Sequence, residues 1–252
     1  MDADFRGLGF SEGDLAVVTG AGNGIGRATA HILARSGVAV AAWDMAEDPL
    51  DELLKEISQI GQAPAYKMVV DTTDDAAIEA AWQQTARIGL PVRYLVNNAG
   101  PPSFTPLSVA EGARLAIGSY VAVTESWLSH YPDDASSVTF TASTAGNYVG
   151  GSGMQAWYPT VKMGIVGYVR HLAVQQRGRP RVNAIAPGLT VTPRTAVHLT
   201  PESAERIKKE PLGRPAQPEE QAAGICFLLS PAASFINGVL LPIEGGVSWM
   251  SR

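Results

Sequence analysis

Apolar and polar positions alternate in two ways along this chain. Short runs that are apolar at nearly every position are followed by longer runs in which apolar residues recur every three or four positions. Nearly continuous apolar runs are typical of strands buried on both faces, and the longer pattern is typical of amphipathic helices. Because the two patterns alternate along the whole sequence, they predict repeated βα units and an α/β fold around a mostly parallel sheet.

The pattern defines the expected elements. The strands are expected at Leu15–Thr19, Val38–Trp43, Tyr66–Val70, Tyr94–Asn97, Val138–Thr141, Val182–Ile185 and Val239–Pro242. The helices are expected at Gly24–Ser36, Leu50–Ile60, Asp74–Arg87, Ser108–Leu128, Trp157–Gln176 and Pro218–Leu229. Two segments predict loops that wall a substrate site: the glycine-rich stretch 146–153, and 189–211, where prolines flank a short polar helix.

Composition narrows the class of protein. A length of 252 residues fits one large domain or two small ones, and the uninterrupted alternation favours one domain over 1–252. Only 17% of residues are charged and 46% are hydrophobic, which predicts a large core with room for subunit contacts. A net charge of −5 disfavours nucleic acid as a partner. No apolar run approaches the ~20 residues of a membrane helix and no export signal is evident, so we expect a cytoplasmic protein without membrane contact.

A glycine-rich turn follows the first expected strand and opens the first helix. Backbone N–H groups and the helix dipole at such a turn hold a pyrophosphate, and glycine lets the backbone approach it. The alternative is an ordinary strand-to-helix turn, since this pattern alone is weak evidence. The residues of the turn that we expect to contact a dinucleotide are Gly20, Asn23, Gly24, Ile25 and Gly26.

Two aspartates at strand ends bear on the choice of cofactor. Asp44 follows the turn by roughly 20 residues, where a carboxylate accepts hydrogen bonds from the adenosine ribose. It would repel a 2′-phosphate, and Asn23 adds no cation to offset that repulsion, so we predict NAD(H) rather than NADP(H). A cap for the following helix is the alternative for Asp44. Asp71 could accept from the adenine amino group, or could serve only to form a turn.

Further motifs strengthen this interpretation. They are Thr19-Gly-Ala-Gly-Asn-Gly-Ile-Gly26, Asn97-Asn-Ala-Gly100, Ser143, Tyr158 with Lys162, Pro187-Gly188 followed by Thr192, and a tail with Gly213-Arg-Pro and Glu244-Gly-Gly246. In this order they resemble the classical short-chain dehydrogenase/reductase family over nearly the whole chain. The resemblance implies a single-domain Rossmann fold with a doubly wound, seven-stranded parallel sheet, a nicotinamide cofactor, and hydride transfer between an alcohol and a carbonyl. It also implies that Asn98, Ala99, Gly100, Pro187, Gly188 and Thr192 line the cofactor cleft, and that the chain forms a homo-oligomer, a dimer or tetramer. An ordinary turn is the alternative for the asparagine segment, and a loop threonine is the alternative for Thr192.

The expected catalytic residues are Ser143, Tyr158 and Lys162. Tyr158 and Lys162 are four residues apart on one helix, so their side chains face the same way. A nearby cation favours the phenolate, which makes Tyr158 the candidate general acid/base, and Lys162 also contacts the cofactor ribose. Ser143 follows a strand at the carboxyl edge of the sheet and would hold the substrate oxygen. By itself, each of these residues also has a purely structural explanation.

The sequence departs from the family pattern in two places. The family has an asparagine that helps a water link the lysine to solvent, and its counterpart here is Ala116. Ser119 is a possible substitute, and we expect activity to persist with a weaker proton relay. The stretch from Ser143 to Tyr158 is about two residues longer than the family pattern, and its extra glycines suggest a movable wall beside the substrate.

These residues suggest a substrate class and leave rival functions open. Ser143, Tyr148, Met154, Trp157 and Tyr158 are the expected substrate contacts, with Pro101 and Pro102 nearby. Because no Arg or Lys lies among them, we predict a small, mostly uncharged and apolar ketone or secondary alcohol. Packing is the alternative for Met154 and Trp157. The rival functions are a catalytically weak NAD(H)-binding sensor or scaffold, and an isomerase or dehydratase. The histidines show no metal-ligand spacing, so no metal is expected.

Overall fold

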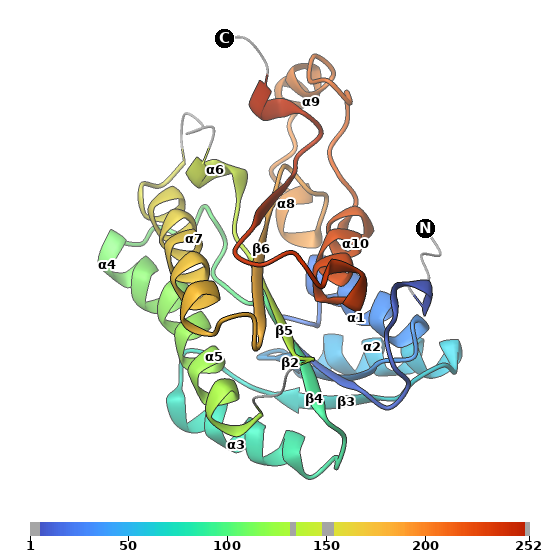
Figure 1. Cartoon of the computed structure of the whole chain (residues 1–252). Helices are drawn as coiled ribbons and strands as arrows, with labels where there is room; N and C mark the ends of the chain where they lie inside the picture. The colour runs from blue at the N-terminus through green and yellow to red at the C-terminus, as the bar shows by residue number, and fades with distance from the viewer. Residues whose placement is uncertain (1–5, 132–134, 148–153, 250–252) are drawn as a thin grey trace.

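Seven parallel strands form the centre of the computed structural model, which describes residues 6–131, 135–147 and 154–249 (Figure 1). Their order in the sheet is β3-β2-β1-β4-β5-β6-β7. The strands are β1 (Leu15–Thr19), β2 (Ala39–Asp44), β3 (Ala65–Val69), β4 (Val92–Asn97), β5 (Ser137–Thr141), β6 (Arg181–Pro187) and β7 (Leu240–Ile243). Each expected strand is present, with bounds that differ from the prediction by two residues or fewer. The doubly wound parallel fold is therefore confirmed.

Helices cover both faces of this sheet. One layer consists of α1 (Gly24–Arg35), α2 (Glu47–Ile60) and α10 (Pro218–Leu229), and the other of α3 (Asp75–Ala86), α5 (Ser119–His130) and α7 (Trp157–Gln175). Side chains of β1 alternate between the two layers: Val17 packs with the α3–α5–α7 side, and Val18 with the α1–α2–α10 side. The strands are buried on both faces, which explains why the sequence shows nearly continuous apolar runs there.

The helix expected over Ser108–Leu128 is instead three consecutive segments. A short helix, α4 (Val109–Gly112), leads into a π-helical turn, η2 (Ala113–Gly118), before α5 begins. π-helical turns are rare and are often found at functional sites. This turn contains Ala116, which is buried.

Short helices occupy parts of both predicted loops. The turn α6 (Thr144–Asn147) precedes 148–153, which lies outside the described residues, while α8 (Pro193–Ala196) and α9 (Pro201–Ile207) fill the second loop. Thr192 and Thr200 cap these two helices with their hydroxyls. Threonine followed by proline is a strong helix-start signal, and it occurs twice in this segment. The segment therefore contains two short helices, where one was predicted from the sequence. The described residues also include the 3-10 turns η1 (Arg6–Leu8), η3 (Pro231–Ala233) and η4 (Val247–Trp249).

The strand order reverses between β1 and β4. The chain runs from β1 outward to β2 and β3, then crosses back to place β4 on the other side of β1. In open parallel sheets the loops after these two strands separate, and the crevice between them is where ligands bind. The glycine turn after β1 and the asparagine-containing turn after β4 both lie at this edge. In the part of the chain that the structure describes, none of the helices has the length and apolar character that crossing a membrane demands.

Candidate active site

The glycine turn after β1 has a backbone that side chains would obstruct. Gly20 and Gly24 have φ angles of +65° and +54°, in the left-handed region that favours glycine. A Cβ on Gly26 would collide with the carbonyl oxygen of Gly20. Helix α1 begins at Gly24, and its N-cap residue Asn23 makes no side-chain capping bond. The first N–H groups of α1 therefore lack a side-chain cap, which suits an anion such as a pyrophosphate.

Asp44 lies against this turn. Its Oδ2 atom accepts a hydrogen bond from the backbone N–H of Gly22 at 2.9 Å, and its Oδ1 atom accepts from the N–H of Ala46 at 3.1 Å. A Cβ on Gly22 would approach both Asp44 Oδ2 and Pro49 Cβ to 3.0 Å, so glycine is needed for this contact. The carboxylate is thus held at the sheet edge by two backbone donors, and its remaining lone pairs are available to a ribose.

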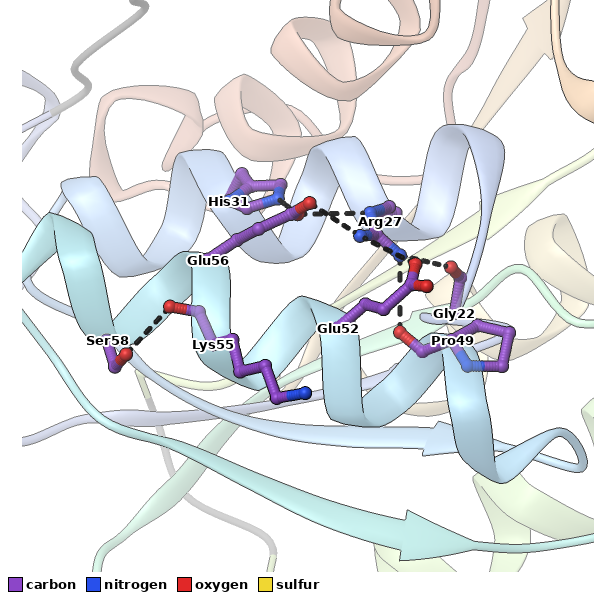
Figure 2. Close-up of polar contacts among 8 residues, drawn as sticks. All are labelled: Gly22, Arg27, His31, Pro49, Glu52, Lys55, Glu56 and Ser58. Atoms are coloured by element: carbon purple, nitrogen blue, oxygen red, sulfur yellow. Dashed lines mark hydrogen bonds and ion pairs between the residues drawn. The ribbon is translucent and has the colours of Figure 1, made fainter.

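Arg27 ties the glycine turn to the start of α2 (Figure 2). Its Nη1 atom donates to the carbonyl oxygens of Gly22 at 3.0 Å and Pro49 at 3.2 Å. Its Nε and Nη2 atoms form a two-point pair with Glu56, at 3.2 and 2.7 Å. His31 Nε2 lies 2.7 Å from the same carboxylate. The pairing with Arg27 lowers the pKa of Glu56, and burial lowers the pKa of His31. This cluster fixes the turn on the side away from the sheet edge.

The turn after β4 is connected to the glycine turn by side-chain hydrogen bonds. The Thr19 hydroxyl accepts from the N–H groups of Asn98 at 2.9 Å and Ala99 at 3.1 Å. The Asn98 amide donates to the carbonyl oxygens of Thr19 and Gly20, and its oxygen accepts from the Thr141 hydroxyl at 3.3 Å. These bonds join the ends of three strands through Thr19, Asn98 and Thr141, and of these three residues only Asn98 was predicted to line the cleft.

Ser143, Tyr158 and Lys162 come together beyond the end of β5. The Ser143 hydroxyl is hydrogen-bonded to the Tyr158 side chain, and it also accepts from the N–H of Ala145 at 3.2 Å. Lys162 is buried, and its Nζ atom donates to the carbonyl oxygen of Thr141 at 2.7 Å and lies 5.7 Å from the centre of the Tyr158 ring. The arrangement gives a phenol with a hydrogen-bonding partner on one side and an ammonium on the other.

Burial and charge shift the pKa values of this group in opposite directions. Burial lowers the pKa of Lys162 to about 7, with a smaller contribution from the positive charge of Arg194. Burial raises the pKa of Tyr158, while the hydrogen bond from Ser143 and the charge of Arg194 partly offset that rise. Burial therefore shifts both groups toward their neutral forms. A site whose titratable groups are this strongly perturbed is a candidate for proton transfer.

Helix α8 reaches across the cleft from the opposite side. A Cβ on Gly24 would lie 3.0 Å from Thr192 Cγ2, so the start of α8 packs on the glycine turn. The Thr192 hydroxyl accepts from the N–H of Thr195 and caps α8. Arg194 donates to the carbonyl oxygen of Gly100 at 3.0 Å, and its charge acts on Tyr158 and Lys162. Arg194 could not be predicted as a site residue from the sequence. Its proximity to Tyr158 depends on how the segment 189–211, which contains α8, folds against the rest of the chain.

The other expected substrate contacts differ in their surroundings. The Trp157 ring is buried, donates to the carbonyl oxygen of Thr105 at 2.8 Å and packs edge-on to Tyr158, which favours the packing alternative. Met154 is 37% exposed just before α7. Pro101 and Pro102 are partly buried after β4. Tyr148 lies outside the described residues.

Other residues expected at the site form hydrogen bonds or close packing contacts within the protein itself. Asp71 accepts from the N–H and the hydroxyl of Thr73 at 2.9 and 2.8 Å, as a turn-forming aspartate does. Ser119 donates to carbonyl oxygens of its own helix at Leu115 and Ala116, so it does not replace the family's asparagine. Pro187 accepts from the Thr144 hydroxyl, while Gly188 packs too closely on Glu244 to accept a Cβ.

Three further observations concern parts of the molecule outside this site. In the part of the chain that the structure describes, no group of three or more His, Cys, Asp or Glu residues is arranged to hold a metal ion. A surface hollow of about 450 Å³ is lined by residues of α1 and α2 with Glu219 of α10, and it contains none of the expected site residues. Cys226 is buried in the core between α10 and the sheet, where burial raises the pKa of its thiol.

Known proteins are similar to this chain over nearly their whole length. A family model described as enoyl-(acyl carrier protein) reductase matches residues 20–248. Cis-4-hydroxycyclohexanecarboxylate dehydrogenase of Sinomonas cyclohexanicum is 34% identical over 92% of this chain and 95% of that protein. Meso-2,3-butanediol dehydrogenase of Serratia marcescens is 32% identical over 93% of this chain and 94% of that protein. The crystal structure of levodione reductase, 31% identical, has a TM-score of 0.86 and covers 96% of this chain and 100% of that chain. Similar solved structures include complexes with NADH and with NADP.

Proposed function

Because this chain belongs to the classical short-chain dehydrogenase/reductase family, we propose that it interconverts a secondary alcohol and a ketone with NAD(H) as its cofactor. Its relatives are dehydrogenases and reductases, and the chain is an oxidoreductase that acts on CH–OH groups. One observation carries the proposed mechanism: the Ser143 hydroxyl is hydrogen-bonded to Tyr158, with buried Lys162 four residues further along the same helix.

The three side chains have separate roles in this proposal. Tyr158 is the general acid/base: its hydroxyl gives a proton to the carbonyl oxygen in reduction and takes it from the alcohol in oxidation. Ser143 donates to the same substrate oxygen and holds it beside the Tyr158 hydroxyl. Lys162, when protonated, favours the phenolate form of Tyr158 through its positive charge.

The nicotinamide cofactor supplies or accepts the hydride when it is bound. The uncapped start of α1 and the glycine backbone fit a pyrophosphate, and Gly20, Asn23, Gly24, Ile25 and Gly26 would contact it. Asp44 would accept from the ribose hydroxyls, and its charge supports the choice of NAD(H) over NADP(H). We assign the remaining cofactor contacts to Asp71, Asn98, Ala99, Gly100, Tyr158, Lys162, Pro187, Gly188 and Thr192.

We propose a small, mostly uncharged and apolar substrate. In this proposal Pro101, Pro102 and Met154 would supply apolar surface to the substrate, and Tyr148 would join them. The similarity to a dehydrogenase of meso-2,3-butanediol supports a neutral substrate. Arg194 favours a second candidate, a substrate with a carboxylate, and the similarity to cis-4-hydroxycyclohexanecarboxylate dehydrogenase points the same way.

In this proposal the whole chain acts as one dinucleotide-binding unit. The segments 146–153 and 189–211 then select the substrate, because no separate substrate domain remains. The protein would work in the cytoplasm as a homodimer or homotetramer. An NAD(H)-binding sensor and an isomerase or dehydratase remain the rival functions, since the family's asparagine is replaced by Ala116.

A turnover assay separates these functions. Purified protein is mixed with NAD⁺ and neutral or acidic secondary alcohols, and with NADH and the matching ketones, and the nicotinamide absorbance is followed. We expect turnover with neutral cyclic or branched substrates, and Tyr158→Phe should reduce kcat by about 100-fold or more while NADH still binds. Tyr131→Phe is the control, because the Tyr131 hydroxyl donates to the Trp82 carbonyl oxygen at 3.2 Å and has no role in the proposed site. Cofactor binding without any turnover would favour the sensor, and product without change in NADH would favour an isomerase or dehydratase.

A further inference from the structure

The space beside Lys162 is filled by a residue that the expected mechanism does not use. Ala116 is buried within the π-helical turn η2 and carries only a methyl group where the family has an asparagine. Tyr120 follows four residues later, and its ring is almost fully buried. Ala116 lies in η2 and Tyr120 in the first turn of α5, and the Tyr120 ring is the one that reaches Lys162.

Tyr120 contacts the lysine in two ways. The Lys162 Nζ atom lies 5.6 Å from the centre of the Tyr120 ring, almost the same as its 5.7 Å from the Tyr158 ring. The Tyr120 hydroxyl donates at 3.4 Å to the Thr141 carbonyl oxygen, which also accepts from Lys162 at 2.7 Å. The ammonium is therefore flanked by two aromatic rings and shares its acceptor with one of their hydroxyls.

A buried ammonium needs such contacts because it has lost its hydration. It has three N–H donors, and the Thr141 carbonyl oxygen satisfies one of them. Among the described residues, no carboxylate forms an ion pair with Lys162. The negative faces of the aromatic rings then supply the electrostatic stabilisation, which is stronger where water is excluded.

We propose that Tyr120 is a positioning residue for the reaction, whose ring holds the protonated Lys162 beneath Tyr158 in place of the family's asparagine and its water. The proposal rests on the proposed function, because positioning matters only if Tyr158 transfers a proton. It explains why an alanine is tolerated at 116: the lysine is held by a ring and a carbonyl, without a side-chain amide.

Within the part of the chain that the structure describes, the groups that face Lys162 come from four elements. They are Tyr158 on its own helix α7, Tyr120 on α5, the Thr141 carbonyl at the end of β5, and Arg194 on α8. The positive charge of Arg194 lowers the pKa of Lys162. The negative face of the Tyr120 ring stabilises the protonated form of Lys162 and so raises that pKa. Weakening the ring's negative face should therefore make Lys162 release its proton at lower pH.

Fluorinated rings test this without changing the shape of the site. Tyr120 is replaced by phenylalanine and then by phenylalanines carrying one, two and five ring fluorines, which remove the negative face stepwise. The titration of Lys162 is followed by NMR of protein labelled at the lysine ε-carbon, with Lys162→Met to assign the signal. We expect Tyr120→Phe to leave the midpoint within about half a pH unit, and the fully fluorinated ring to lower it by about one further pH unit.

The same series at Phe140 is the matched control. Phe140 is buried and packs against Tyr120 at 5.9 Å between ring centres, whereas the rings that Lys162 contacts among the described residues are those of Tyr120 and Tyr158. Its fluorination should leave the Lys162 midpoint unchanged. A midpoint that stays constant across the Tyr120 series, or that moves equally in the Phe140 series, overturns the proposal. The titration needs no substrate, so it can succeed or fail independently of the turnover assay that tests the proposed function.

Discussion

The backbone N–H of Gly22 donates to Oδ2 of Asp44 at 2.9 Å, which fixes a negative charge at the edge of the glycine turn. We expect Asp44→Ala to weaken NADH binding by about tenfold, because hydrogen bonds to the ribose are lost. The same change should strengthen NADPH binding, because the 2′-phosphate no longer meets a carboxylate. Isothermal titration with each cofactor measures both dissociation constants.

Asp48→Ala provides the matched control for that measurement. Asp48 is exposed in the first turn of α2 and should not affect either dissociation constant by more than about twofold. An unchanged ratio of NADH to NADPH affinity in Asp44→Ala would show that this carboxylate does not select the cofactor.

The contacts of Arg27 lead to a second prediction about the glycine turn. Arg27→Met removes the bonds to Gly22 and Pro49 and leaves Glu56 without its arginine, so we expect a loss of about 1–3 kcal/mol in the free energy of unfolding. NADH should bind several-fold more weakly. Urea unfolding and cofactor titration measure the two effects, with Arg87→Met as an exposed control at the end of α3.

The stability difference between wild type and Arg27→Met should depend on pH. Arg27 lowers the pKa of Glu56 in the folded protein, so the stability that Glu56 gains is present above its unfolded pKa and is lost as pH falls through the folded pKa. The difference should therefore shrink below about pH 4. A difference that persists unchanged in acid would assign the effect to the backbone bonds of Arg27 alone.

The fold was predictable wherever the chain's own periodicity decides the structure. The bounds of α10 and β1 match the prediction because a proline starts the helix and turn residues end the strand. The stretch from Ser108 to Leu128 was wrong as one helix, since apolar spacing does not distinguish an α-helix from a π-helical turn.

The site was predictable only where its residues lie in sequence motifs. Ser143, Tyr158 and Lys162 could be grouped from their spacing and resemblance. Tyr120 and Arg194 could not, because their proximity to Lys162 depends on how α5 and α8 pack against α7. The one sequence signal was Ala116 in place of the family's asparagine, which led us to consider Ser119 as a substitute and to predict a weaker proton relay.

Burial of Lys162 predicts a pH-dependent stability. The unfolded lysine keeps its proton until about pH 10.5, whereas the folded one loses it at about 7, so the unfolded chain binds more protons between these values. Stability relative to Lys162→Met should therefore rise with pH, by about 3 kcal/mol from about pH 7 to pH 9.5, and stay constant below that window. Urea unfolding at several pH values measures it.

Lys209→Met is the control for the lysine experiment. Lys209 is exposed beyond α9, and its replacement should give the same pH dependence as the wild type. If Lys162→Met also follows the wild-type curve, the folded lysine titrates near its ordinary pKa and burial does not perturb it.

Arg194 should control the protonation of Lys162 across the cleft. Its positive charge lowers the pKa of Lys162, so Arg194→Gln should raise the NMR midpoint of Lys162 by about half a pH unit. Because Arg194 is exposed, the shift should diminish as salt is raised to about 1 M, where charges are screened within about 3 Å. Arg206→Gln, on the exposed face of α9, should give no shift at any salt concentration. An Arg194→Gln midpoint equal to wild type in low salt would mean that the guanidinium exerts no field on the catalytic lysine.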